Sequence, residues 1–247
     1  MKILALEFSS SERSVAVVQG AGPRLATKSD PVSAHEVASA LKGANQIPGL
    51  KIVEFVETGA LGANVIGMID SALREAQCER EQIECLAVGL GPGSYNGIRL
   101  AIAVAQGWQL ASGDDRIKLV GVSSADCIAA QSLEEGIAGP VNVVIDAQRG
   151  EFYLAGYELN SEGWNETEPL RLVNLQEVQH RADAGEIFLG PDVAANLSGG
   201  RRVFPRAATL GRLALGRTNF VEGENLQPIY LREAAFVKAP PPRRHLP

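Results

Sequence analysis

One order of predicted strands and helices occurs twice along this chain, and that repetition constrains the fold more than any other feature. Short apolar or alternating runs predict three initial strands, over Lys2–Phe8, Ser14–Gln19 and Ile52–Glu57. Helices and strands are then expected in alternation over residues 61–76, 84–90, 98–111, 118–122 and 124–131. The predicted order of this part of the chain is therefore βββαβαβα.

The same order begins again after residue 140. Three strands are predicted first, followed by alternating helices and strands. Their expected ranges are 141–146, 151–157, 170–173, 175–181, 187–189, 192–197, 201–204 and 207–217. A repeated α/β order predicts a duplicated α/β architecture. We place the first half at residues 1–134 and the second half at residues 135–221.

Two segments do not fit the repeat. Residues 24–50 lengthen the first half and contain Pro31, Gly43, Pro48 and Gly49, so we expect an insertion that forms a surface loop or a short helix. Residues 222–247 form a C-terminal segment with a proline-rich end. Because consecutive prolines block both helix and sheet, this end is expected to be an extended, mobile tail.

Composition and charge exclude several classes of protein. Of the 247 residues, 45% are hydrophobic and 21% are charged, which is typical of globular proteins and argues against a disordered chain. Lys and Arg number 23 against 29 Asp and Glu, a net charge of −6 that argues against binding nucleic acid alone. No apolar run reaches the ~18–20 residues of a membrane helix, and no signal peptide is recognisable at the N-terminus, so we expect a cytoplasmic protein.

The sequence also predicts no metal site. Cys78, Cys85 and Cys127 follow no C-x-x-C spacing, so they are expected to be reduced and buried. The three histidines lie far apart, and no H-E-x-x-H motif is present.

A glycine-rich segment between a buried strand and a helix is the most informative motif. It runs from Gly89 to Arg99, and Ser94 or Asn96 is placed to cap the helix. Gly91, Gly93, Ser94 and Gly97 would form a cradle for a phosphate or carboxylate at the helix N-terminus. The alternative is a tight turn that binds nothing. The segment lacks the third glycine of the dinucleotide fingerprint and the Gly-Lys-Ser/Thr of a P-loop.

Two carboxylates end equivalent strands of the two halves. Glu7 and Asp146 would face one cleft, where they could hold a metal-bound nucleotide or act as acid and base. Alternatively, each side chain caps its own hairpin, and we favour this interpretation for Glu7. For Asp146 we expect a polar hairpin turn in which the carboxylate accepts backbone N–H bonds.

Two consecutive helices of the first half carry an excess of apolar residues. Either both are buried within the fold, or one side of them contacts a partner chain. Gly67 lies in mid-helix, where glycine costs about 1 kcal/mol relative to alanine, so a close neighbour is expected there. The predicted interface residues are Leu61, Val65, Gly67, Met68, Ile98, Ile102 and Ala105.

Taken together, five segments make the chain resemble the TsaB family, also called YeaZ. They are Lys2–Ser10, Gly91–Arg99, Gly121–Ser124, Ile145–Tyr153 and Pro228–Arg232, which occur in the family order and span nearly the whole chain. The resemblance implies the duplicated fold of actin-like ATPases and sugar kinases, the ASKHA or ribonuclease H-like fold, in a glycoprotease-like paralogue of TsaD. The chain departs from the family pattern at Glu7, where Asp is usual.

The resemblance implies a non-catalytic dimerisation or scaffold subunit of the tRNA N6-adenosine threonylcarbamoyltransferase complex, which modifies tRNA beside the anticodon. The implied partners are a TsaD-like catalytic paralogue, which the subunit activates, and a TsaE-like ATPase. Transfer RNA would be contacted only through the complex, and the isolated chain would form a homodimer. No cofactor is expected on the chain itself, whereas ATP and Mg²⁺ are compatible with the assembled complex.

The leading alternative is an enzyme in its own right, an actin-like-fold ATPase or small-molecule phosphotransferase. It would use Glu7, Asp146 and the loop Gly91–Gly97. A metallopeptidase-like glycoprotease ranks third, because the sequence shows no pair of metal ligands.

Overall fold

The computed structural model describes residues 1–20, 49–59, 64–113, 116–192 and 194–232. Nearly all of the predicted insertion at 24–50 lies outside these residues, and so do Leu61 and the proline-rich end of the tail. Within the part that is described, no helix is long and apolar enough to cross a membrane.

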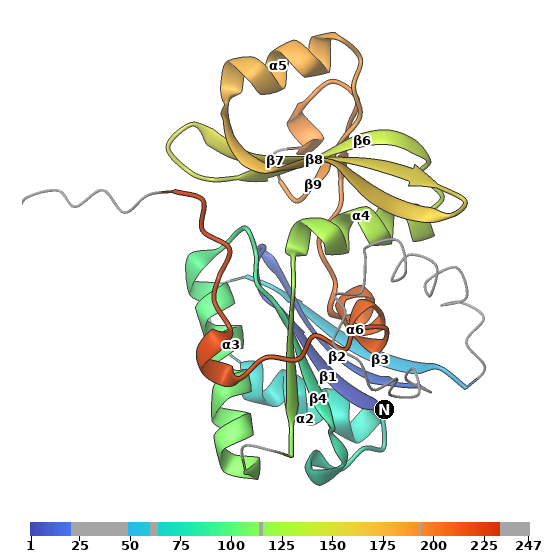
Figure 1. The fold of residues 1–247 in the computed structure, drawn as a ribbon, viewed down its shortest axis with the longest axis vertical. Coiled ribbons are helices and arrows are strands. Elements are labelled where there is room, and N and C mark those ends of the chain that lie inside the picture. The colour runs from blue at the N-terminus through green and yellow to red at the C-terminus, as the bar shows by residue number, and fades with distance from the viewer. Residues whose placement is uncertain (21–48, 60–63, 114–115, 193, 233–247) are drawn as a thin grey trace, which may run out of the picture.

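The first half builds a five-stranded mixed sheet (Figure 1). Its strands are β1 (Lys2–Glu7), β2 (Glu12–Gln19), β3 (Lys51–Thr58), β4 (Cys85–Gly89) and β5 (Lys118–Val122). Their order across the sheet is β3-β2-β1-β4-β5. β1, β4 and β5 run parallel, whereas β2 pairs antiparallel with both β1 and β3.

The second half builds a second sheet with the same topology. Its strands are β6 (Gly139–Asp146), β7 (Glu151–Asn160), β8 (Gly163–Asn174), β9 (Phe188–Gly190) and β10 (Gly200–Arg202). Their order is β10-β9-β6-β7-β8, which makes β6 equivalent to β1 and β9 equivalent to β4. The predicted duplicated α/β architecture is confirmed.

The helices follow the predicted order with one exception. The α-helices are α2 (Val65–Glu75), α3 (Tyr95–Ser112), α4 (Ser124–Glu134), α5 (Leu175–Asp183) and α6 (Ala207–Leu215). The 3-10 turns are η2 (Arg80–Gln82), η3 (Ala194–Asn196) and η4 (Gly223–Asn225). The helix expected over 192–197 is wrong, because this stretch forms only the single turn η3. Among the described residues of the second half, none form a long counterpart of α3.

The two faces of the first sheet pack against different helices. Leu4 and Leu6 of β1 belong to a core shared with α2 and α3. The alternate residues Ile3 and Ala5 point to the opposite face, into a second core that includes α6. This alternation follows from the two-residue period of a strand. Both faces of β1 are therefore covered, as its continuous apolar sequence predicts.

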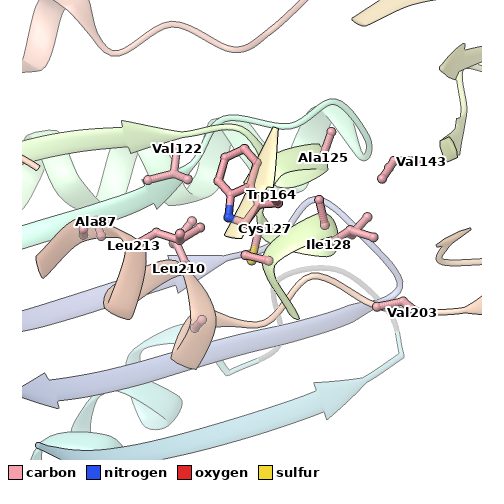
Figure 2. Packing of buried hydrophobic residues seen from close by; sticks show 14 of the residues in the cluster. Ala87, Val122, Ala125, Cys127, Ile128, Val143, Trp164, Val203, Leu210 and Leu213 are labelled. Carbon is pink, nitrogen blue, oxygen red and sulfur yellow. The ribbon is translucent and has the colours of Figure 1, made fainter. Parts of the chain in front are cut away.

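The last helix of each half crosses to the other half. α6 follows the second sheet in sequence but contacts β1 and β2, whereas α4 follows the first sheet and contacts β7, β8 and β9. The two helices meet between the sheets (Figure 1). Their side chains share one core with Trp164 of β8, and Cys127, Ile128, Leu210 and Leu213 belong to it (Figure 2). The boundary at 134/135 stays a prediction, but the halves exchange their terminal helices.

Candidate functional site

A cleft of ≈ 950 Å³ lies between the two halves. One wall is the turn after β1, with Ser9–Ser11, and the start of α3. The opposite wall is the turn between β6 and β7, with Asp146–Arg149. Tyr230 and Arg232, from the segment after η4, also line the cleft. The cleft thus lies at the end of the first strand of both sheets, where the sequence analysis placed a site.

The glycine-rich loop is packed against the turn after β1. The Ser94 amide donates to the Ser9 carbonyl at 2.6 Å, and the Ser124 amide donates to the Gly91 carbonyl at 2.8 Å. A Cβ at Gly93 would lie 2.1 Å from the Ser9 carbonyl oxygen, and a Cβ at Gly97 would lie 1.9 Å from the Phe8 carbonyl oxygen. Backbone approaching backbone at these distances leaves no room for a side chain, so the chain itself requires these glycines.

Ser94 caps α3 as the sequence predicted. Its Oγ accepts a hydrogen bond from the Gly97 amide at 3.4 Å. A cap of this kind satisfies one of the free amides at the start of a helix. These contacts within the chain are the ones that a tight turn between strand and helix requires.

Glu7 lies behind the loop, away from the cleft. Its side chain is fully buried, accepts a bond from the Ser9 amide at 2.8 Å and accepts another from the Ser124 hydroxyl at 2.9 Å. Burial raises the pKa of this carboxyl above its usual value, and the bonds from Ser9 and Ser124 oppose that shift. The expectation that Glu7 caps its own turn is confirmed, and the bond to Ser124 also ties that turn to α4.

Asp146 lies at the surface of the cleft. It is exposed and accepts bonds from the Gln148 amide at 2.7 Å and from the Gln148 side-chain Nε2 at 2.9 Å. The predicted hairpin turn with Asp146 as a backbone acceptor is confirmed. The structure brings Gly93, Ser94 and Asp146 to the cleft surface, whereas Glu7 is fully buried and none of its atoms lines the cleft. The proposed anion cradle stays a prediction, and its six residues do not form one surface.

Several side chains in or beside the cleft were not predicted from the sequence as parts of a site. Arg13 is only 5% exposed and donates to the Gly59 carbonyl at 3.2 Å. Tyr95 and Tyr230 stack with ring centroids 5.2 Å apart, and Arg99 lies over the Tyr95 ring. Desolvation by burial raises the pKa of Tyr230 to about 12. Arg13 lies outside the segments that contributed to the family resemblance, whereas Tyr95, Arg99 and Tyr230 lie within two of them, Gly91–Arg99 and Pro228–Arg232.

The predicted interface residues of α2 and α3 face inward. Val65, Met68, Ile98, Ile102 and Ala105 are all at most 7% exposed and belong to the core between the helices and the first sheet. Their assignment to a partner surface is therefore corrected: they pack within the chain and present no surface.

Gly67 also has a different neighbour from the one expected. It is half-buried, and a Cβ there would meet the side chain of Asn64, the N-cap of the same helix, rather than a second helix. A polar side chain of an exposed residue can move, so this contact is not evidence of a close partner helix.

Beyond Arg99, the exposed face of α3 is nevertheless apolar. Ala103, Gly107 and Leu110 are exposed, with Leu110 74% exposed, and the half-buried Leu100 continues the same spacing of three and four residues. On α2, the side chain of Ile66 is 66% exposed. A small residue such as Gly107, with nothing within 4 Å of its Cβ position, leaves space for a neighbouring helix. We call Ile66, Leu100, Ala103, Gly107 and Leu110 the outer helix face.

The structure shows no metal centre in the ranges it describes. Within these residues, no three His, Cys, Asp or Glu side chains are grouped so that they could hold an ion. Cys78, Cys85 and Cys127 are free and buried, as predicted.

Comparison with known proteins identifies relatives of this chain. The family model for "TsaD: tRNA N6-adenosine threonylcarbamoyltransferase" matches residues 60–202, more than half of the sequence. The tRNA threonylcarbamoyladenosine biosynthesis protein TsaB of Escherichia coli K12 is 29% identical over 196 residues, which cover 71% of this chain and 83% of the relative. The protein of the same name from Bacillus subtilis 168 is 26% identical over 132 residues, covering 51% of this chain and 54% of the relative.

Solved structures share the fold. The structure described as YeaZ from Pseudomonas aeruginosa superimposes with a TM-score of 0.70 at 23% sequence identity, covering 93% of this chain and 99% of the other. A second structure from the same organism, described as similar to peptidase YEAZ, has a TM-score of 0.69. The duplicated topology is therefore shared over nearly the full length of both chains.

Proposed function

Because the chain belongs to the TsaB/YeaZ branch of the TsaD family, we propose that it is the non-catalytic scaffold subunit that binds and activates a TsaD-like catalytic paralogue. It takes part in the biosynthesis of threonylcarbamoyladenosine in tRNA. In this role the chain contributes to assembly of the complex. Its apolar surface binds the catalytic subunit and holds that subunit in its working conformation.

The outer helix face carries the proposal. Leu110 and Ile66 are largely exposed. When a partner covers them, their apolar surface is removed from water, which favours binding. Ala103 and Gly107 lie between the larger side chains of α3 and permit a helix of the partner to approach closely. The inward-facing residues of the same helices keep α2 and α3 fixed on the sheet, so the face is presented as a rigid surface.

Contacts within the chain explain why Glu7 and the glycines of the loop after β4 are present without a catalytic role. The Glu7 carboxylate is buried and bonded to Ser9 and Ser124, and it has no exposed surface for a substrate. Gly93 and Gly97 are required by the carbonyl groups of Ser9 and Phe8. These contacts support a role in which the chain contributes surface rather than catalytic side chains.

The interface is tested with Leu110→Arg. A charged side chain within a covered apolar surface is costly when it has no partner, so affinity for the TsaD-like subunit should fall at least about a hundredfold. In the free chain the same side chain reaches water, so the thermal midpoint should change little. Leu175→Arg is the matched control, because Leu175 is an exposed leucine on α5 of the other half. Undiminished binding by Leu110→Arg would place the interface elsewhere.

The same face explains the proposed self-association of the isolated chain. This chain and its catalytic paralogue would offer similar surfaces. A second copy of this chain can therefore take the place of the catalytic paralogue and form a homodimer. The proposal also includes docking of a TsaE-like ATPase, contact with tRNA only within the complex, and a cytoplasmic location. Sedimentation of the wild-type chain and of Leu110→Arg at micromolar concentration checks the shared surface: the variant should be monomeric.

The cleft favours one alternative function, an ATPase or phosphotransferase acting alone. A cleft of ≈ 950 Å³ lined by Arg13, Arg149 and Asp146 has the size and charges to admit a nucleotide. Titration of Mg-ATP into the isolated chain distinguishes the two functions. Binding together with hydrolysis that Asp146→Ala abolishes would establish the alternative and overturn the non-catalytic role.

A further inference from the structure

The segment after η4 contacts both halves of the molecule at the cleft. Its Ile229 amide donates to the Leu90 carbonyl at 2.9 Å, in the loop between β4 and α3. Three residues later, the Arg232 Nη2 lies 3.0 Å from the Ala147 carbonyl oxygen, in the turn between β6 and β7. We propose that residues Ile229–Arg232, here termed the strap, hold the two halves at a fixed separation across the cleft.

The strap is firmly attached to the first half. Upstream of it, the Gly223 amide donates to Gln109 Oε1 at 3.1 Å, and Gln106 Nε2 donates to the Gly223 carbonyl at 2.8 Å. Leu226 is 4% exposed and belongs to the core of α2 and α3. Tyr230 then stacks on Tyr95 at the start of α3. These contacts fix the strap before it reaches the second half, and Figure 1 shows the segment running beside α3 toward the upper sheet.

Arg232 makes the contact with the second half. Its Nη2 is surrounded by three acceptors: the Ala147 carbonyl, the Gln148 carbonyl at 3.1 Å and the Glu151 carboxylate. Gln148 and Arg149 have positive φ values of 64° and 61°, which form the turn that places these carbonyls together. A guanidinium shared by a carboxylate and two carbonyls forms charge-assisted bonds, which are stronger than neutral ones.

The position of the strap determines what it can control. The halves are joined between the sheets by the core of α4 and α6, and the cleft lies at the ends of β1 and β6, where both hairpin turns line it. In two-part proteins of this kind, a bound ligand commonly bridges the parts and sets how closed they are. Here the bridging contacts come from the chain's own C-terminal segment. The strap thus takes over the part that a ligand would play in setting the closure of the cleft.

The test measures the separation of the halves in the full chain. Spin labels on Glu75→Cys of α2 and Asp183→Cys of α5 report this separation, because both positions are exposed. The three native cysteines are buried and therefore react poorly with the label. Labelled protein is diluted with unlabelled protein, so that only distances within one chain contribute.

Two variants break the contact between the strap and the second half in different ways. Arg232→Gln removes the cation, and a truncation that deletes residues 229–247 removes the whole strap but keeps the buried Leu226. Their matched controls are Arg149→Gln, an exposed arginine in the turn that Arg232 contacts, and a truncation that deletes only residues 234–247.

Loss of hydrogen bonds to a charged group shifts an equilibrium by about tenfold or more, so the distance distribution should broaden toward longer separations in both strap variants. Both controls should keep the wild-type distribution. A wild-type distribution in Arg232→Gln and in the 229–247 deletion would overturn the proposal. Because the measurement needs no partner protein, its outcome is independent of the outcome for the proposed scaffold function.

Discussion

Glu7 and Asp146 end equivalent strands of the two halves, yet their surroundings are opposite. Glu7, at the end of β1, is fully buried and bonded to Ser9 and Ser124. Asp146, at the end of β6, is exposed and accepts hydrogen bonds from Gln148 in its own turn. Both carboxylates accept a backbone amide two residues ahead, so the local turn is conserved between the halves while the burial is not.

The difference arises from the next crossover in each half. After β4, the loop that contains Gly91 and Gly93 leads into the 18-residue helix α3 and packs over the turn after β1. After β9, the equivalent position continues through Pro191 and Asp192 into the single turn η3. Duplicated topology therefore places a carboxylate at the same strand end in both halves. The length of the loop and helix in the next crossover decides whether that carboxylate is covered.

Closing the space under the first crossover should have the largest effect. Gly97→Ala places a Cβ 1.9 Å from the Phe8 carbonyl oxygen, and a backbone atom cannot move aside as a flexible side chain can. We expect a loss of about 3 kcal/mol or more in the free energy of unfolding, measured by urea denaturation.

The control for this prediction lies on the same helix. Gly107→Ala has no atom within 4 Å of its new Cβ. It should raise the free energy of unfolding by about 0.5–1 kcal/mol, because alanine favours the helix. Equal effects of the two substitutions would show that the loop is not packed against β1 as described.

Removing the buried carboxylate should have the next largest effect. Glu7→Ala leaves a cavity and deprives the Ser9 amide and the Ser124 hydroxyl of their acceptor. The expected loss is about 2–4 kcal/mol in the free energy of unfolding, from the sum of cavity and unsatisfied donors. A loss below about 1 kcal/mol would mean that water replaces the carboxylate and that Glu7 is less enclosed than the structure has it.

The same site predicts a pH-dependent effect of Glu7→Gln. Burial raises the pKa of Glu7 in the folded chain above the usual value of 4.5, so the folded state holds its proton more tightly than the unfolded state. The stability contributed by protonated Glu7 is therefore present below that value and is lost as pH rises through the higher pKa of the folded chain.

Glutamine has the same shape but does not ionise. Relative to wild type, Glu7→Gln should therefore gain stability between acidic and mildly alkaline pH, as measured by urea denaturation at both ends of that range. A difference between variant and wild type that stays constant with pH would contradict the raised pKa.

The equivalent substitution in the second half should have the smallest effect. Asp146→Ala removes two bonds to Gln148 from an exposed turn, where water replaces the lost acceptor. We expect a loss of about 0.5–1 kcal/mol in the free energy of unfolding. If Asp146→Ala destabilises the chain as much as Glu7→Ala, the contrast between the two strand ends is wrong.

Most of the secondary structure was predictable from the sequence, because it depends on local patterns. Strand and helix periods are set by neighbouring residues, so the order of elements followed from apolar spacing alone everywhere except at residues 192–197. The backbone bonds accepted by Glu7 and Asp146 were also predictable, since each spans only two residues. The helix expected over 192–197 was wrong because a short apolar segment at this length does not separate a helix from a single 3-10 turn.

The orientation of α2 and α3 could not be predicted in the same way. α3 is apolar nearly all round, so its sequence has no clear polar face to mark the side toward solvent. The residues predicted to contact a partner, such as Ile98 and Ile102, are the ones that pack on the first sheet. The outer helix face became identifiable only when the sheet showed which side of α3 it covers.

The sequence by itself determined the duplicated order of elements, the two strand-end carboxylates and the family to which the chain belongs, because all three are recorded in local spacing and in short motifs. Only the tertiary structure decided that α4 and α6 exchange halves, that Glu7 is covered while Asp146 is open, and that Arg232 reaches the turn between β6 and β7. These features join residues far apart in the chain. Their geometry depends on how whole sheets and helices pack, which no local pattern encodes.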